Sequence, residues 1–201
     1  MATDIQQIIR TLEAFYDFSG KTVVHVGAGG GQLMGYAVGA KRIFAIDDNS
    51  DTIKFLKSVV ENLRLTNVST LQSDFSDVDA SGDVVFFEFC LHEIEDPGAA
   101  LGKALEMAAE VLILDHAPES QWAWFTAETE KATASWNAVK RFGISRERMY
   151  HAVQKFSDYQ ELYDKIKVLG EPSVSRIFEF KDKKNIHVGM DYTLALIQNE
   201  S

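Results

Sequence analysis

The hydrophobic positions of the chain follow two periods, and their alternation predicts strands separated by helices. Thr3 and Gln6 have the spacing of a capping box, and apolar residues at helical spacing between positions 5 and 16 predict an amphipathic helix that ends near Gly20. Short apolar runs rich in β-branched residues then predict strands at 22–26, 42–47, 68–72, 83–89 and 110–115.

The segments between these strands carry helical signals. A helix is expected after the glycines that follow the first strand, and Ser50 can cap the next one. Asp96 and Pro97 suit the N-cap and first turn of a helix that runs to about Ala109. Strands this apolar are buried on both faces, which places helices on both sides of a parallel sheet. We therefore predict an α/β fold with a doubly wound, mostly parallel, Rossmann-like sheet of seven strands.

The pattern becomes helical after the strand at 110–115. Apolar residues at spacings of three and four from Trp122 to Val139 predict one helix, and Ser145 can cap a second that runs to about Phe156. We expect residues 118–156 to form a helical cap inserted into the domain.

The last part of the chain predicts a return to the sheet. Ser157 and Gln160 can open a further helix, and the apolar runs 173–180 and 190–197 flank a polar turn as in an antiparallel hairpin. Such a hairpin would close the parallel sheet, so we predict one domain over residues 1–201.

The composition is that of an ordinary globular protein. The 201 residues have a mass of 22.5 kDa, with 46% hydrophobic and 25% charged residues, which suits one domain with a sizeable core. The apolar runs are far shorter than the roughly 18 residues of a membrane span, and the first residues lack a secretory signal. Cys90 is the single cysteine, so we expect no disulfide framework, no metal site and a cytoplasmic location.

The net charge limits the partners. A net charge of −10 repels nucleic acid, so we expect none as a partner. A neutral or cationic small ligand fits better, although backbone N–H groups can satisfy a phosphate locally. The sequence does not indicate an oligomeric state.

A glycine cluster is the sharpest local signal. Gly27, Gly29 and Gly31 come directly after a strand, where glycine lets the backbone bend tightly and lets a ligand approach the main chain. A dinucleotide-binding fingerprint needs Gly or Ala at the sixth position, but Gln32 stands there. The spacing is G-x-G-x-G instead.

Four segments in order along the chain carry a family resemblance. They are VVHVGAGGGQL, FAIDDNS, SDFSD and FFEFCLHEIEDP, within residues 20–115. Together they resemble the motifs of class I S-adenosylmethionine-dependent methyltransferases, in particular the small-molecule branch that includes quinone and sterol C-methyltransferases. The resemblance implies S-adenosylmethionine as the cofactor and a small-molecule methyl acceptor.

The resemblance also implies a cofactor site. Asp47, at the end of a strand, would accept the ribose hydroxyls, and the adjacent Asp48 would disfavour a phosphorylated nicotinamide cofactor. Asp74 would accept from the adenine amino group, with Phe75 beside the ring. A helix cap for Asp47 and a solvated loop for Asp74 are the alternative interpretations.

Other cofactor contacts follow from the first and fourth motifs. Relatives usually carry Asp or Glu where this chain has His25, which either contacts the cofactor end of the glycine turn or is a core histidine. The turn itself, with Ala28 among its glycines, would lie under the amino-acid end of the cofactor. We expect Glu88 and Phe89 to contact the cofactor or to make packing contacts, and we expect Cys90 to lie in the core.

Two histidines are the candidate catalytic residues. His116 ends the strand that faces the acceptor side, so we expect it to contact the substrate and to act as a base. His92 is a second candidate base, unless it only shapes the cofactor pocket. Among the tryptophans, Trp124 lies off the apolar stripe of Trp122 and Trp136 and is the predicted substrate contact.

Three functions remain open at this point. The first is a methyltransferase for a small molecule. The second is a protein that binds S-adenosylmethionine or S-adenosylhomocysteine without catalysis, which the unusual His25 would suit. The third is an NAD-dependent oxidoreductase.

Overall fold

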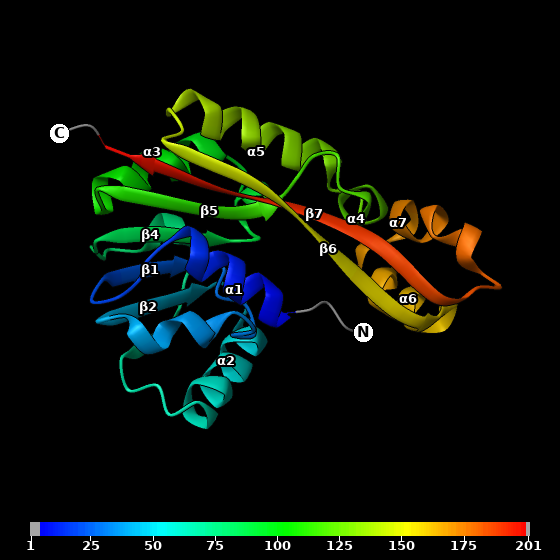
Figure 1. The fold of residues 1–201 in the computed structure, drawn as a ribbon, viewed down its shortest axis with the longest axis horizontal. Coiled ribbons are helices and arrows are strands. Elements are labelled where there is room, and N and C mark those ends of the chain that lie inside the picture. The colour runs from blue at the N-terminus through cyan, green and yellow to red at the C-terminus, as the bar shows by residue number, and fades with distance from the viewer. Residues whose placement is uncertain (1–4, 200–201) are drawn as a thin grey trace.

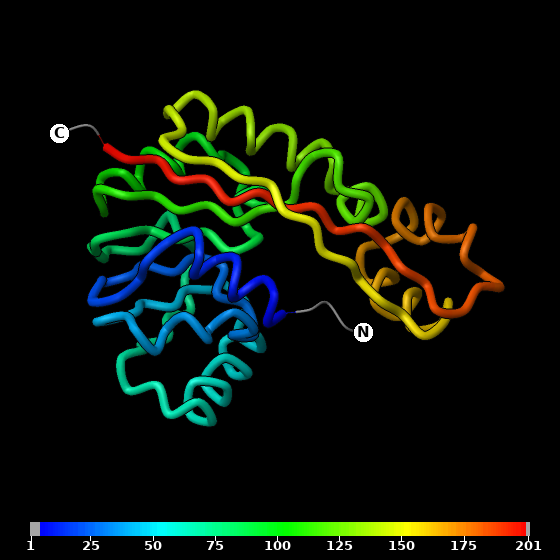
Figure 2. The backbone as a smooth tube through the Cα atoms, in the orientation of Figure 1, coloured from blue at the N-terminus to red at the C-terminus, as the bar shows by residue number. Residues whose placement is uncertain are grey.

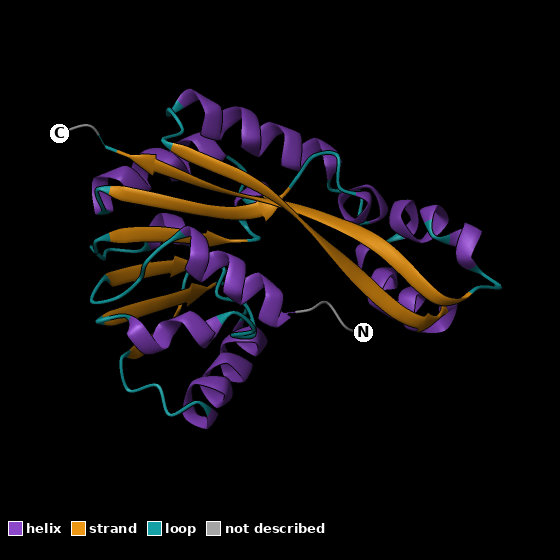
Figure 3. Cartoon of the chain, viewed as in Figure 1, coloured by secondary structure: helices purple, strands orange, loops and turns teal. Residues whose placement is uncertain are grey.

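The computed structural model describes residues 5–199, whose strands form one seven-stranded sheet in the order β3-β2-β1-β4-β5-β7-β6. Neighbours among β1 to β5 are parallel, whereas β7 is antiparallel to both β5 and β6. Figure 3 shows the sheet with its helices. The strands are β1 (Thr22–Val26), β2 (Arg42–Asp47), β3 (Val68–Gln72), β4 (Val84–Glu88), β5 (Glu110–His116), β6 (Arg146–Asp158) and β7 (Lys184–Gln198). The predicted mostly parallel sheet with an antiparallel end is confirmed.

Helices cover both faces of this sheet (Figure 1). The α-helices are α1 (Ile5–Phe15), α2 (Ser50–Asn62), α3 (Pro97–Met107), α4 (Gln121–Phe125), α5 (Thr129–Arg141), α6 (Tyr159–Ile166) and α7 (Glu171–Arg176). Short 3-10 helices are η1 (Met34–Gly39), η2 (Phe75–Asp77), η3 (Leu91–Glu93), η4 (Lys167–Leu169) and η5 (Phe178–Phe180). Among the described residues, no helix is both long enough and apolar enough to cross a membrane.

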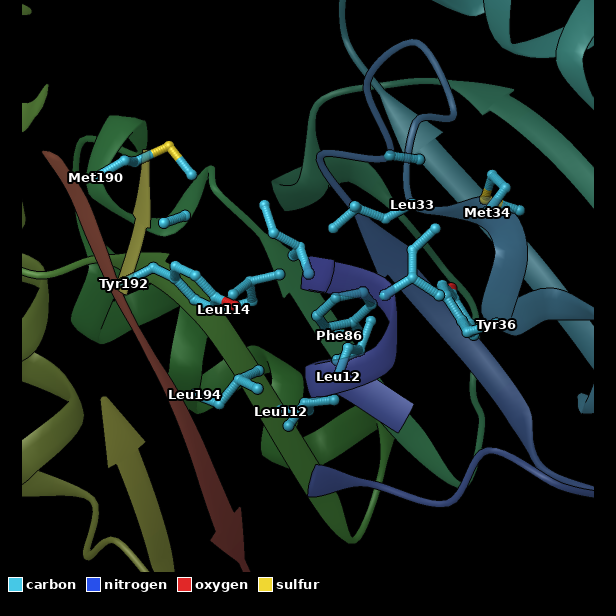
Figure 4. Close-up of a cluster of buried hydrophobic side chains, with 14 of the residues drawn as sticks. Leu12, Leu33, Met34, Tyr36, Phe86, Leu112, Leu114, Met190, Tyr192 and Leu194 are labelled. Carbon is cyan, nitrogen blue, oxygen red and sulfur yellow. The ribbon is translucent and has the colours of Figure 1, made fainter. Parts of the chain in front are cut away.

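Two hydrophobic clusters hold these layers together. On one face, α1, η1 and α2 pack against the sheet, and Leu12, Met34 and Phe86 are fully buried members of the cluster shown in Figure 4. On the other face, α3 and α5 pack against the strands. Each CH₂ group buried against the central strands, on either face, contributes about 0.8 kcal/mol to the stability of the fold. A ligand-binding site is expected at the edge where the carboxyl ends of the parallel strands lie.

The antiparallel hairpin is built differently from the prediction. β6 pairs with β7 from Arg146 opposite Leu196 to Asp158 opposite Lys184. Residues 146–156, predicted as a helix, are therefore a strand. Residues 173–180, predicted as a strand, instead form α7 and η5. Burial alternates with a period of two only from Tyr150 onward, and the residues before it are all exposed. The apolar side chains of β6 were therefore too few to show a strand in the sequence.

The outer halves of β6 and β7 extend beyond the sheet, past the carboxyl ends of the parallel strands (Figure 2). Residues 159–183 connect them with α6, η4, α7 and η5, and we call this helical segment the arm. The predicted cap at 118–156 is corrected accordingly, because α5 packs on α3 over the sheet and 146–156 belong to β6. The helical segment at the end of the hairpin comes later in the chain.

Helix starts follow the sequence signals with small shifts. The Asp96 carboxylate accepts from Ala99 N as the predicted N-cap of α3. Asn49 rather than Ser50 caps α2, and Asp158 rather than Ser157 caps α6. The side chain one position earlier or later than predicted thus satisfies the free N–H groups. Thr3 of the predicted capping box lies outside the described residues.

Candidate functional site

The carboxyl ends of the parallel strands open onto a pocket of about 780 Å³, which we call the first pocket. Val26 ends β1 and Gly27 follows it, and both line this pocket, as does Asp47 at the end of β2. The turns after β3 and β4 and the start of α3 complete the lining. Ligands of open α/β sheets bind at this edge.

The glycine turn after β1 is shaped by close packing. Gly27 has φ of 68°, in the left-handed region, and a Cβ there would lie 2.5 Å from the Sγ of Cys90. Gly31 has φ of 76°, and its Cβ would lie 2.8 Å from Leu56 of α2. Glycine is therefore required at both positions. Only Gly27 of the two lines the first pocket; Gly31 serves the packing of α2.

Asp47 ties the glycine turn to α2. One carboxylate oxygen accepts from Gly29 N at 3.0 Å, and the other accepts from Asn49 N at 3.1 Å. A carboxylate has about four acceptor sites, so both oxygens can still accept a further hydrogen bond. Asp47 is thus both a structural residue and an acceptor at the pocket wall.

The far end of the first pocket is formed at η2. Asp74 caps this turn by accepting from Ser76 N at 2.7 Å, and the hydrogen bonds from Ser76 hold the pKa of Asp74 below its usual value. Phe75 packs edge-on against Phe87, with Lys103 Nζ 5.6 Å from its ring centre. An ionised carboxylate and an aromatic ring therefore stand side by side at this end.

His25 does not reach the first pocket. It is fully buried beneath the glycine turn, where its Nε2 lies 2.9 Å from the Glu88 carboxylate and its Nδ1 lies 2.9 Å from the Tyr36 hydroxyl. Burial raises the pKa of Glu88, and His25 partly offsets this effect. The neighbouring strand thus supplies the carboxylate that this chain lacks at position 25.

A second pocket, of about 180 Å³, lies between the sheet and the arm. The turn after β4 and the end of β5 contribute Phe89, His92, Glu93 and His116; α4 and the loop after it contribute Trp122, Thr126 and Glu128; the arm contributes Lys165, Val168 and Leu169. Glu93 lines both pockets. The two pockets therefore adjoin each other.

A buried carboxylate orients His92 in the second pocket. Asp115, fully buried, accepts from the backbone N–H groups of His92 at 3.0 Å and His116 at 2.8 Å, and lies 2.6 Å from His92 Nδ1. An ionised carboxylate only accepts, so Nδ1 carries the proton and Nε2 is directed away from Asp115. Burial alone would lower the pKa of His92, but Asp115, Glu128 and Glu93 raise it above its usual value.

His116 has a different environment. Burial lowers its pKa to about 4, so its imidazole is neutral at neutral pH. Its ring packs against Phe89, with ring centres 4.8 Å apart, and its buried Nδ1 has no hydrogen-bond partner among residues 5–199. The second pocket is thus lined by a neutral imidazole with one unpaired, buried nitrogen.

The backbone on either side of the second pocket is strained. Phe89 has φ of 45° and Ala127 has φ of 63°, in the left-handed region that non-glycine residues avoid. Such conformations cost about 1 to 3 kcal/mol each and concentrate at functional sites. The surrounding packing holds these two turns in place.

Comparisons with known proteins place this architecture in a family. Residues 17–166 match a family model described as a methyltransferase domain. The chain belongs to the methyltransferase domain family. Its fold is that of the class I S-adenosylmethionine-dependent methyltransferases, as the sequence resemblance predicts. No curated protein sequence matches this methyltransferase.

Solved structures share the fold at low identity. The YcgJ protein of Bacillus subtilis superposes with a TM-score of 0.71 and 14% identity, covering 98% of both chains. An S-adenosylmethionine-dependent methyltransferase of Aquifex aeolicus gives 0.61 and 20%, covering 97% of this chain and 90% of that one. Magnesium protoporphyrin IX methyltransferase of Synechocystis, with bound S-adenosylhomocysteine, gives 0.59 and 11%, covering 95% and 80%. These likenesses establish the architecture of this methyltransferase.

The site residues predicted from the sequence fall into three groups in the structure: those that line the first pocket, those that line the second pocket, and those that line neither. Gly27, Asp47, Asp48, Asp74 and Phe75 line the first pocket. Phe89, His92 and His116 line the second. Neither pocket is lined by His25, Ala28, Gly29, Gly31, Glu88 or Trp124.

Sequence reasoning missed other residues that line the second pocket. Trp124 is 46% exposed beside Arg176, and it is Trp122 that lines the second pocket. Glu128 follows α4 with no motif around it, so no sequence signal could have found it. Glu93 directly follows His92, and its place in the fourth motif was the one available signal.

Proposed function

We propose that this S-adenosylmethionine-dependent methyltransferase transfers a methyl group to a small molecule held in the second pocket. The observation that carries the proposal is the joining of two unlike pockets at Glu93. The first pocket has the hydrogen-bond acceptors and the volume for an adenosyl ligand. The second pocket is small and is lined by histidines and aromatic rings.

The first pocket fits the cofactor. Asp47 has unused acceptor sites at the end of β2, where a ribose can be held. Asp74 would accept from the adenine amino group, and Phe75 would contact the ring. Gly27 would lie beside the amino-acid end, and a side chain there would collide with Cys90 and displace the turn. S-Adenosylmethionine supplies an electrophilic methyl group when bound.

The second pocket favours a small acceptor. Its volume of about 180 Å³ admits a compact molecule or one end of a longer one. Trp122, Phe89 and Leu169 provide apolar walls that exclude water from the reacting atoms. Because the net charge is −10, nucleic acid is a poor fit. We assign the substrate contact to Trp122 in place of Trp124.

Methyl transfer requires alignment of the acceptor, and removal of its proton where it carries one. We assign to His116 the role of accepting a hydrogen bond, and then the proton, from the acceptor, because its imidazole is neutral and its Nδ1 is unpaired. His92, held by Asp115, faces the same acceptor through Nε2. Both histidines thus serve the acceptor rather than the cofactor.

Calorimetry with variants tests the cofactor site. Asp47→Ala should weaken binding of S-adenosylhomocysteine by about 1 to 3 kcal/mol, because charge-assisted hydrogen bonds are lost. The matched control is Asp79→Ala, which removes the same charge from an exposed loop position outside the first pocket. Equal affinity of the two variants would remove Asp47 from the site.

A labelling experiment tests the acceptor class. Donor labelled in its methyl group, incubated with the protein and separate small-molecule and RNA fractions, should label the small molecules. Label found in the RNA alone would contradict the proposal. Binding of NAD in the first pocket, with none of either sulfur nucleoside, would instead favour an oxidoreductase.

A further inference from the structure

We propose that His92, Glu93 and Glu128 bind a divalent transition-metal ion between the two pockets. The single cysteine led us to expect no metal site, but it argues only against thiolate ligands, and Glu128 is remote from the other two ligands in the chain. The fold brings one nitrogen and two carboxylates together at a place where an acceptor atom would lie.

The ligand atoms are close enough for one ion. Nε2 of His92 lies 3.8 Å from a carboxylate oxygen of Glu93 and 3.8 Å from one of Glu128, and all three ligand atoms lie within 4.8 Å of one another. Atoms that share an ion at about 2.1 Å each are at most about 4.2 Å apart. The ligand atoms must therefore move slightly closer together to share an ion, and the exposed Glu93 side chain can make this movement.

His92 is oriented as metal-binding histidines are. Its Nδ1 lies 2.6 Å from Asp115, whose carboxylate is fixed by two backbone N–H groups. A carboxylate behind the ring fixes the tautomer and directs the other nitrogen toward the metal. Thr126 likewise donates to the Glu128 carboxylate at 2.6 Å. Two of the three ligands are therefore held in place before any ion arrives.

A second observation also points to a ligand at this place. His116 is 8% exposed, lines the same pocket and has an unpaired ring nitrogen. A buried polar atom without a partner is costly, so a bound group that can pair with it is expected. Lys165 is the basic residue of this lining, and its side chain is exposed.

The ligand set suggests the class of ion and its use. Imidazole with carboxylates suits Mn²⁺, Fe²⁺ or Zn²⁺. This use of the ion rests on the proposed function: with three protein ligands, coordination positions remain open, and an acceptor oxygen or nitrogen bound there would lose its proton more readily. His116 would then take that proton, while His92 serves as a ligand.

Calorimetric titration of the purified, chelator-treated protein with Mn²⁺, without any nucleoside, tests the site. The wild type should bind one equivalent, and Glu128→Gln should weaken binding at least tenfold. The control Glu130→Gln removes an exposed charge two residues away, on α5, and should bind like the wild type.

The outcomes separate this proposal from the function itself. Circular dichroism and S-adenosylhomocysteine affinity, measured on the same variants, report the fold and the first pocket. Absence of saturable Mn²⁺ binding, or equal affinity of Glu128→Gln and wild type, overturns the metal site while leaving the methyltransferase intact. Failure of the nucleoside to bind a protein that takes up Mn²⁺ overturns the proposed function alone.

Discussion

At the scale of single residues, the glycine turn and the strand beside it define each other. Cys90, expected in the core, fills the space where a side chain at Gly27 would lie, and its thiol also donates to Val26 O. The cysteine thereby fixes the position of the turn that borders the first pocket. The position of this turn therefore depends on a steric fit between the segments that follow β1 and β4 rather than on a charged group.

Substitution of this glycine gives a sharp test. Gly27→Ala places a Cβ 2.5 Å from Cys90 at φ of 68°, so the turn must shift and S-adenosylhomocysteine affinity should fall at least tenfold in calorimetry. Gly102→Ala is the control, because nothing lies within 4 Å of its Cβ in α3. It should raise helix stability by about 0.5 to 1 kcal/mol without changing affinity. Unchanged affinity in Gly27→Ala would refute the fit.

Which site residues the sequence could predict follows from how they are placed. Asp47 ends β2 and Asp74 lies two residues after β3. Because parallel strands end at one edge, strand prediction alone brings the two residues together. The role of Glu88 as the partner of His25 depends on the pairing of β1 with β4. Glu128 enters the second pocket from a loop, and no periodicity gives that position.

At the scale of elements, the arm at the end of the hairpin forms one wall of the second pocket. The parallel strands were predictable because continuous apolar runs have one interpretation in an α/β chain. β6 was not, because an edge strand with alternating polar residues, RERMYHAVQKF, also fits a helical period. The helical cap was wrongly predicted at residues 118–156 for the same reason.

Removal of the arm should separate binding from turnover. Asp158 and Lys184 are paired across the hairpin, so a two-residue Asn-Gly turn can replace residues 159–183. The variant loses Lys165, Val168 and Leu169 from the second pocket. It should keep S-adenosylhomocysteine affinity and lose methyl transfer. Retained turnover in a variant that circular dichroism shows to be folded would place the acceptor elsewhere.

At the scale of the whole molecule, a polar cluster closes the sheet edge opposite the site. Glu110 at the start of β5 accepts from Lys21 Nζ at 2.8 Å and from Gln198 at 3.0 Å, and also accepts from the Tyr16 hydroxyl. It joins the segments before β1 and after α1 to β5 and β7. Burial opposes ionisation of Glu110, but these hydrogen bonds lower its pKa below the usual value.

This cluster predicts a pH dependence of stability. Because the pKa of Glu110 is lower in the folded than in the unfolded chain, its stabilisation is present above the unfolded value near 4.5 and is lost as the pH falls through the folded value. Thermal unfolding of Glu110→Gln should therefore give a lower Tm than wild type at pH 7, and the difference should narrow below about pH 4. A difference independent of pH would contradict this role.

The central claim is that an adenosyl ligand lies in the first pocket with its reactive end toward the second. A crystal structure with S-adenosylhomocysteine tests it most directly. The account predicts ribose hydroxyls on the Asp47 carboxylate, adenine beside Asp74 and Phe75, and the sulfur near Glu93, where the pockets adjoin. A ligand bound elsewhere, or one whose sulfur points away from His92 and His116, would contradict it.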